Sequence, residues 1–368
     1  MLVMWVSAVS AADAPASLPA PPSGIDIGAV MQSIGIRAAD QPVRLRQGWR
    51  RPRTILLAAD LEDQRAALEG VASGVRFVVV NSATPASVVA EADAAIGLCS
   101  PELLQNAVHL QWIQWLGAGV ERCVQVPSVR EQRLLVTNMQ RAFGPSIAEH
   151  VLGLMLVLSR HLNTYITEQQ RAHWADDSKD VPLMEDLEGR TLLVVGLGGI
   201  GTEVAQRAHA LGMRVIATRA SGRTGPDFVS YVGLPDELFK LAQDADFVVN
   251  CLPLTPQTTG LYNRAFFAMM KPSAYFLSVG RGRSTVTADL IGALTAHLIA
   301  GAALDVTDPE PLPADNPLWH MPNVVITPHV AANSPMADEI IRALVRENVR
   351  RYAAGEPMLS VVDVERGY

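Results

Sequence analysis

The chain is short of cysteine, aromatic residues and positive charge. Its 368 residues include three cysteines, Cys99, Cys123 and Cys251, which lie far apart and form no CxxC pair. This number and spacing indicate neither a disulfide framework nor a zinc site, so we expect buried thiols and no metal. The net charge of -7 excludes the overall basic field that favours nucleic-acid binding. Residues 44–53, RLRQGWRRPR, are the one local basic cluster, which we interpret as a solvated linker.

Long apolar runs are also missing. No run reaches the roughly eighteen residues needed to cross a bilayer, so we expect no membrane partner. Residues 1–12 are nonetheless apolar, pass through AVSA at 8–11 and lead into a Pro- and Ala-rich stretch that ends near Gly24. This resembles the end of a secretory signal, but the first basic residue is Arg37. A disordered extension, or a region read from a misplaced start codon, fits equally well.

The strongest positive feature is VVGLGGIG at 194–201, which has GxGxxG spacing. An apolar, β-branched strand candidate at 191–195 precedes it, a helix candidate follows to Leu211, and a second strand candidate covers 214–217. This is a βαβ unit in which the helix N-terminus faces a phosphate. An ordinary Gly-rich turn is the alternative, but the context favours a dinucleotide site lined by Gly196, Leu197, Gly198, Gly199, Ile200 and Gly201.

The residue that ends the second strand indicates which dinucleotide binds. NAD-binding units usually carry an acidic residue there, which accepts hydrogen bonds from the ribose hydroxyls. This chain has Arg219, with Ser221 and Arg223 close behind. Two guanidiniums and a hydroxyl suit a ribose phosphate, and no repelling carboxylate stands among them, so we predict NADP, with NAD as the alternative. Solvated loop charges without a ligand would look the same.

A separate α/β unit precedes the glycine motif. Strand candidates at 54–59, 75–80, 94–98 and 134–138 alternate with helix candidates at 62–70 and 101–107. Gly117, Ala118 and Gly119 interrupt the sequence before the last of these strands, where successive backbone amides could hold a carboxylate, although a plain turn uses glycine too. An apolar helix candidate at 146–162 leads into the second unit, and we interpret its His150 as a packed or partner-facing residue rather than a catalyst.

Three chemically distinctive side chains follow strand candidates in the second unit. Arg281 follows the strand at 275–279, Glu310 lies in the loop DPEPLP after the strand at 301–306, and His329 follows the strand at 324–326. Doubly wound sheets bind ligands outside the carboxyl ends of their strands, so the three should approach one ligand.

In combination these motifs resemble the D-isomer-specific 2-hydroxyacid dehydrogenases. The resemblance runs from about Thr54 to the C-terminus and rests on WLGAGV, NMQRAFGPSIAEH, VVGLGGIG, LPLTPQTTG, VGRG, GAALDVTDPEPLP and ITPHVA. It implies an α/β fold of two Rossmann-like domains, with a doubly wound parallel-sheet nucleotide domain at 144–331 inserted in a flavodoxin-like substrate domain at 51–143 and 332–368. Residues 1–50, which match nothing in the family, would be an extension, disordered or signal-like.

The resemblance also implies roles for individual residues. Arg281 would bind the substrate carboxylate and polarise its carbonyl, His329 would be the acid or base, and Glu310 would orient His329 and favour its protonated form. Asp305 would contact the nicotinamide amide, unless it is only a strand cap. The remaining cofactor contacts would be Leu252, Pro253, Thr258, Val279, Gly280 and His329, and the substrate would meet Leu116, Gly117, Ala118, Gly119, Val120, Arg281 and His329.

We therefore expect an enzyme that reduces a small 2-oxo acid such as glyoxylate, hydroxypyruvate or an aryl pyruvate with NADPH, reversibly toward the D-2-hydroxy acid. A nucleotide-sensing protein like the corepressors built on this fold, and a phosphite-type dehydrogenase, are the alternatives. We expect a cytoplasmic homodimer, with a periplasmic location as the alternative, because relatives usually dimerise through the nucleotide domain and the cytoplasm supplies NADPH.

Overall fold

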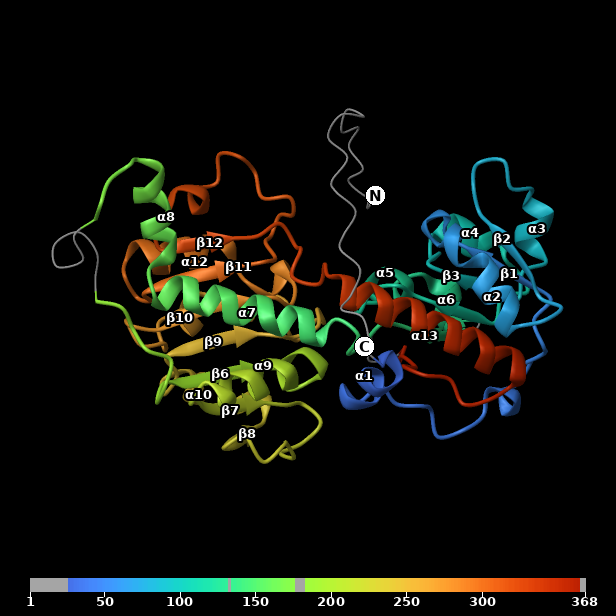
Figure 1. Cartoon of the computed structure of the whole chain (residues 1–368), viewed down its shortest axis with the longest axis horizontal. Coiled ribbons are helices and arrows are strands. Elements are labelled where there is room, and N and C mark those ends of the chain that lie inside the picture. The colour runs from blue at the N-terminus through green and yellow to red at the C-terminus, as the bar shows by residue number, and fades with distance from the viewer. Residues whose placement is uncertain (1–25, 132–133, 176–182, 365–368) are drawn as a thin grey trace.

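The computed structural model describes residues 26–131, 134–175 and 183–364 of the chain. These residues form two lobes, each built around a parallel sheet with helices on both faces (Figure 1). The expected α/β class with two parallel sheets is confirmed.

The smaller lobe, here the five-stranded lobe, has the strand order β2-β1-β3-β4-β5, all parallel, which is the flavodoxin-like order. Ile55 and Leu57 of β1 face α2 and α13, whereas Leu56 between them faces α3, α4, α5 and α6. The elements are β1 (Thr54–Leu57), η2 (Ala59–Gln64), α2 (Arg65–Val71), β2 (Arg76–Val79), α3 (Ala86–Ala90), β3 (Ala94–Ile96), α4 (Pro101–Asn106), β4 (Trp112–Gln114), α5 (Glu121–Val124), α6 (Pro127–Glu131) and β5 (Leu135–Thr137).

The larger, seven-stranded lobe has the order β12-β11-β10-β9-β6-β7-β8. Strand order reverses between β6 and β9, so their carboxyl ends define the crevice where this type of sheet binds ligands. Helices α7 and α9 cover one face, and α10, α11 and α12 cover the other. The strands are β6 (Thr191–Val195), β7 (Arg214–Thr218), β8 (Tyr231–Gly233), β9 (Phe247–Asn250), β10 (Tyr275–Ser278), β11 (Gly301–Leu304) and β12 (Val324–Ile326). The helices are α7 (Gly144–Ser159), α8 (Leu162–Gln170), α9 (Gly199–Ala210), η3 (Pro235–Glu237), α10 (Leu238–Ala242), α11 (Arg264–Phe267), η4 (Gly282–Ser284), α12 (Thr287–Thr295) and η5 (Pro317–His320).

Two crossings join the lobes. Helix α7 leaves the five-stranded lobe after β5, and α13 (Pro335–Ala354) returns to it. Ile340, Leu344 and Val349 of α13 are buried against α2 and β1. The helix expected at 146–162 corresponds to α7, which ends three residues earlier, at Ser159, and the left-handed His161 separates it from α8.

Residues 26–50 are ordered, which corrects the expectation of a disordered extension and a solvated linker. They form α1 (Ile27–Ser33) and η1 (Val43–Leu45), and Ile34 and Val43 are buried in the same core as α13. Within the basic cluster, Arg50 pairs with the buried Asp93 at 2.8 Å and Arg44 donates to the carbonyl of Gly355. The signal-like segment lies outside the described residues.

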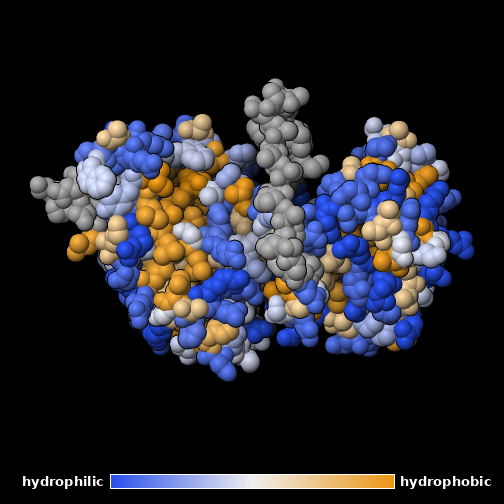
Figure 2. Space-filling model, in the orientation of Figure 1, coloured by the Kyte–Doolittle hydropathy of each residue, from blue (hydrophilic) through white to orange (hydrophobic). Residues whose placement is uncertain are grey.

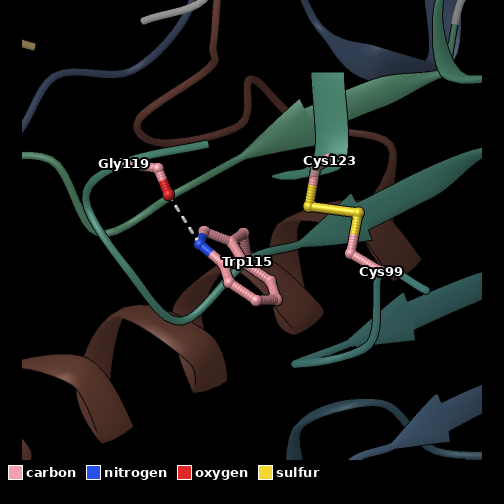
Figure 3. Close-up of a disulfide and its surroundings, with 4 residues drawn as sticks. All are labelled: Cys99, Trp115, Gly119 and Cys123. Carbon is pink, nitrogen blue, oxygen red and sulfur yellow. Dashed lines mark hydrogen bonds between the residues drawn. A yellow bond between two sulfur atoms is a disulfide. The ribbon is translucent and has the colours of Figure 1, made fainter. Parts of the chain in front are cut away.

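The cysteines also differ from the expectation of free thiols. Cys99, which follows β3, and Cys123 in α5 form a disulfide, with Cα atoms 5.5 Å apart, and Cys251 is free (Figure 3). The two cysteines are 24 residues apart in sequence but follow the neighbouring strands β3 and β4. Their spacing alone could therefore not reveal the disulfide. Across the described residues, no helix is both long and apolar enough to cross a membrane.

Candidate active site

The glycine motif forms a tight turn between β6 and α9. Gly196 has φ 99°, which favours glycine, and a Cβ on Gly201 would lie 2.2 Å from the carbonyl oxygen of Gly196. The amides of Gly199, Ile200 and Gly201 have no acceptor among the described residues, and the first bond of α9 runs from the amide of Thr202 to Gly198. The helix N-terminus is thus open to an anion such as a pyrophosphate.

The predicted ribose-phosphate residues lie at the end of β7 but have partners of their own. Arg219 donates to the carbonyl of Thr224 at 2.9 Å, and Ser221 is exposed. Arg223 donates to the hydroxyl of Tyr231 and forms an ion pair with Glu237 at 2.7 Å. The expectation that no carboxylate stands near these residues was therefore wrong, because β8 and η3 bring Glu237 back to this loop.

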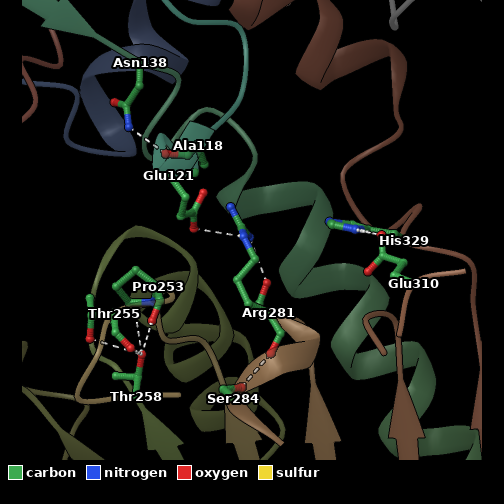
Figure 4. A network of polar contacts seen from close by, with 12 residues as sticks. Ala118, Glu121, Asn138, Pro253, Thr255, Thr258, Arg281, Ser284, Glu310 and His329 are labelled. Carbon is green, nitrogen blue, oxygen red and sulfur yellow. Dashed lines mark hydrogen bonds and ion pairs between the residues drawn. The ribbon is translucent and has the colours of Figure 1, made fainter. Parts of the chain in front are cut away.

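The loop after β9 is held by hydroxyl and amide side chains. The Thr258 hydroxyl donates to the carbonyl of Pro253 at 2.7 Å and accepts from the amide of Thr255 (Figure 4). The fully buried Asn250 accepts from the amide of Leu252 and donates to Ser278 and Ser284. Asn250 thereby connects the ends of β9 and β10, and Val279 and Gly280 follow directly.

Arg281 extends from the end of β10 to the other lobe. Its Nη1 donates to the carbonyl of Gly280, and its Nε donates to Oε1 of Glu121 in α5 at 3.1 Å (Figure 4). A Cβ on Gly119 would lie 1.6 Å from Nη2 of Arg281, so the guanidinium fills the space that any larger residue would need. Residues 116–120 form the predicted substrate loop. The arginine that the sequence predicted as a substrate ligand therefore lies directly against this loop.

The substrate loop presents free backbone amides. The carbonyls of Gly117, Ala118 and Gly119 accept from the Met139 amide, the Asn138 side chain and the Trp115 indole respectively. Among the described residues, the amides of 118–120 have no acceptor. Leu116 lies half-buried at the start of the loop. The loop is thus anchored through its carbonyls and leaves its amides for an anion, which a plain turn need not do.

His329 and Glu310 form a pair. Nδ1 of His329 lies 2.7 Å from Oε1 of Glu310, and the imidazole extends toward the space beside Arg281 (Figure 4). The hydrogen bond with His329 lowers the pKa of Glu310, despite the opposing effect of partial burial, so Glu310 stays ionised at neutral pH. A carboxylate on Nδ1 leaves Nε2 as the nitrogen that can exchange a proton with a substrate.

Asp305 is 3% exposed at the end of β11, and its carboxylate has several partners within the protein. It accepts from the Thr327 hydroxyl and from the amides of Val330 and Ala331, and Nε2 of His150 lies 3.7 Å away. These bonds fix the turn that carries His329. Its predicted contact with the nicotinamide stays a prediction.

Sequence reasoning missed Glu121 and Asn250. Glu121 directly follows the substrate loop, so a carboxylate beside a predicted anion site was a signal that could have been noticed. Asn250 ends a buried strand, where an amide has to find partners.

The comparisons agree with this geometry. Residues 152–331 match the model of the D-isomer specific 2-hydroxyacid dehydrogenase, NAD binding domain. Glyoxylate/hydroxypyruvate reductase A of Photorhabdus laumondii is 32% identical over 276 residues, which are 73% of this chain and 84% of that protein. A D-isomer specific 2-hydroxyacid dehydrogenase family protein from Aeromonas salmonicida superposes with a TM-score of 0.73 at 32% identity, covering 85% of this chain and 99% of that one.

A second similar structure is the NADPH-dependent glyoxylate/hydroxypyruvate reductase of Sinorhizobium meliloti in complex with NADP and sulfate. Its TM-score is 0.72 at 27% identity, with coverage of 86% of this chain and 100% of that one. The fold and site thus define a two-lobed dehydrogenase of the dinucleotide-binding class. The chain belongs to the D-isomer-specific 2-hydroxyacid dehydrogenase family. The expectation of an NAD(P)-dependent oxidoreductase is confirmed.

Proposed function

We propose that this protein reduces a small 2-oxo acid, of the glyoxylate, hydroxypyruvate or aryl pyruvate class, to a D-2-hydroxy acid with NADPH. The observation that carries the proposal is Arg281 lying against the amides of the 116–120 loop, across from the His329–Glu310 pair. A 2-oxo acid needs both features, because it presents a carboxylate beside a ketone.

Arg281 and the loop at 116–120 would both bind the 2-oxo acid. The free amides of Ala118, Gly119 and Val120 suit a carboxylate, and the guanidinium can bind the same carboxylate while polarising the ketone oxygen. Lysine would lose the planar fork that makes both contacts together.

His329 would supply the proton. Its Nδ1 is engaged by Glu310, so Nε2 would donate to the ketone oxygen as negative charge develops there, and would take the proton back in the reverse reaction. Glu310 would stabilise the imidazolium because it remains a carboxylate at neutral pH. When bound, the reduced nicotinamide supplies the hydride.

The cofactor would lie along the glycine turn. The amides at 199–201 fit a pyrophosphate, and Leu252, Pro253, Thr258, Val279, Gly280 and Asp305 border the same strand ends. Arg219 and Ser221 favour NADP, and a relative of similar structure binds it. Arg223 would contact the ribose phosphate as well only if its ion pair with Glu237 breaks.

We further propose the domain division at 51–143 with 332–368, and 144–331, and a homodimer that is cytoplasmic. Support for the dimer is the apolar surface over α7 and α8 (Figure 2). Its exposed members include Leu156 at 39%, Leu162 at 40% and Ile166 at 53%, and contiguous exposed apolar patches are typical of interaction sites.

The test is the initial rate of NADPH and NADH oxidation with glyoxylate, hydroxypyruvate and phenylpyruvate. We expect turnover that favours NADPH, and a loss of kcat/KM of at least about 1000-fold in Arg281→Ala, because both carboxylate binding and carbonyl polarisation disappear. NADH preference would refute the cofactor assignment alone. Tight cofactor binding without turnover on any acid would refute the reductase.

A further inference from the structure

Arg141 occupies an unusual position on the predicted cofactor site. It lies between β5 and α7, in the crossing that joins the lobes, and its φ of 72° is a left-handed conformation that is unfavourable for a residue with a side chain. A Cβ on Gly199 would lie 2.7 Å from Cγ and 3.0 Å from Cα of Arg141. Arg141 therefore packs directly on the first turn of α9, in the space a side chain at 199 would take.

The N-terminal segment holds this arginine from the other side. Nη1 of Arg141 donates to the carbonyl of Ile34 at 3.1 Å and would be 3.2 Å from a Cβ on Gly35. In Figure 1, α1 lies on the edge of its lobe that faces α9. Ile34 and Gly35 thus contact the arginine that packs on the glycine turn, although they precede the part of the chain that resembles the family.

Charged side chains surround Arg141. Burial lowers the pKa of Arg141, and the nearby cations Arg37 and Arg219 lower it further. Glu203 is the opposing carboxylate, but it is hydrogen-bonded to Arg207 one turn along α9. Arg141 therefore brings a cation to a helix N-terminus with open amides, an arrangement that a bound anion would stabilise.

We propose that Arg141, held by the carbonyl of Ile34, binds the pyrophosphate of the dinucleotide, so that the N-terminal segment forms part of the cofactor site. This rests on the proposed function only in assuming that a dinucleotide binds. The pyrophosphate is shared by NADPH and NADH, whereas Arg219 is the residue proposed for the ribose phosphate. The proposal thus separates a general phosphate contact from a contact that selects NADP.

The test is equilibrium binding of NADPH and NADH, followed by nucleotide fluorescence in the absence of substrate. Arg141→Gly is the variant of choice, because glycine suits a φ of 72° and folding should not suffer. We expect its Kd to rise about tenfold or more for both nucleotides, as the loss of a charge-assisted bond predicts. Arg219→Ala should weaken the binding of NADPH alone.

His297→Gly is the matched control, since exposed His297 has φ 52° after α12 and lies outside this site. It should leave both Kd values unchanged. Unchanged Kd values in Arg141→Gly, or an effect on NADPH alone, would overturn the pyrophosphate assignment and leave the reductase intact. Absence of binding to the unmodified protein would instead refute both proposals.

Discussion

Among single residues, Glu121 and Arg281 make the contact with the clearest chemical consequence. Arg281 has three donor nitrogens, and Glu121 accepts from Nε while the carbonyl of Gly280 accepts from Nη1. Nη2 is left directed at the substrate loop. A carboxylate that orients an arginine in this way is a positioning group, since it need not touch the substrate itself.

Glu121→Gln should raise the KM for the 2-oxo acid about tenfold, because the amide still accepts from Nε but no longer holds the guanidinium by charge. The Kd for NADPH should not change. Steady-state kinetics with glyoxylate measures the first value and nucleotide fluorescence the second. Glu69→Gln, at an exposed position on α2, serves as the control.

A double mutant tests whether Glu121 acts through Arg281. Added to Arg281→Ala, the Glu121→Gln substitution should not change KM further, because the arginine that it positions is absent. A lower KM in Glu121→Gln would show instead that the glutamate competes with the substrate for Arg281.

At the scale of secondary-structure elements, Asp246 connects the start of β6 with the segment that precedes β10. Its carboxylate accepts from the amide of Thr191, the first residue of β6, and from Nζ of Lys271 before β10, both at 2.8 Å. Burial opposes the charge, but the bonds to Lys271 and Thr191 outweigh it and lower the pKa of Asp246. The carboxylate therefore stabilises the folded state while it is ionised.

Asp246→Asn should lower the melting temperature at pH 7 by several degrees, as the loss of about 1–2 kcal/mol implies. A lowered folded-state pKa gives stability that is complete above the unfolded value of about 3.9 and is lost as pH falls through the folded value. The difference from the unmodified protein should thus shrink below about pH 4. Thermal unfolding at a series of pH values measures it.

Asp244→Asn is the neighbouring control, since that side chain is exposed. A stability difference for Asp246→Asn that persists unchanged into acid would mean that its charge contributes nothing.

At the scale of the whole molecule, the apolar surface over α7 and α8 is the interface of the proposed homodimer. Helix α7 buries Val151, Leu154 and Leu158 against α9 and the sheet and leaves Leu156 on the opposite side. This outward face continues into α8 (Figure 2). A second copy of this chain is the partner that we propose for it.

The double substitution Leu156→Glu with Ile166→Glu should convert the dimer to a monomer, because it places two charges in an apolar interface. Sedimentation velocity at micromolar concentration measures the result. Val108→Glu, at an exposed position of the five-stranded lobe, should leave the dimer intact. If the unmodified protein itself sediments as a monomer, the proposal of a dimer is refuted.

The sequence by itself determined the fold class, the glycine turn and the order of Arg281, Glu310 and His329 along the chain. These follow from local patterns, because apolar runs of strand length, glycines at fixed spacing and residues after strand ends are all visible within about ten neighbouring residues.

Tertiary structure alone decided which distant groups meet. The pairing of Arg223 with Glu237, of Cys99 with Cys123, and of Glu121 with Arg281 depends on how strands are ordered and how two lobes face each other. The ordering of residues 26–50 has the same origin, since Ile34 and Val43 are buried only because α13 returns from the far end of the chain. Such contacts leave no local pattern in the sequence, because their energy comes from burial and charge between segments far apart along it.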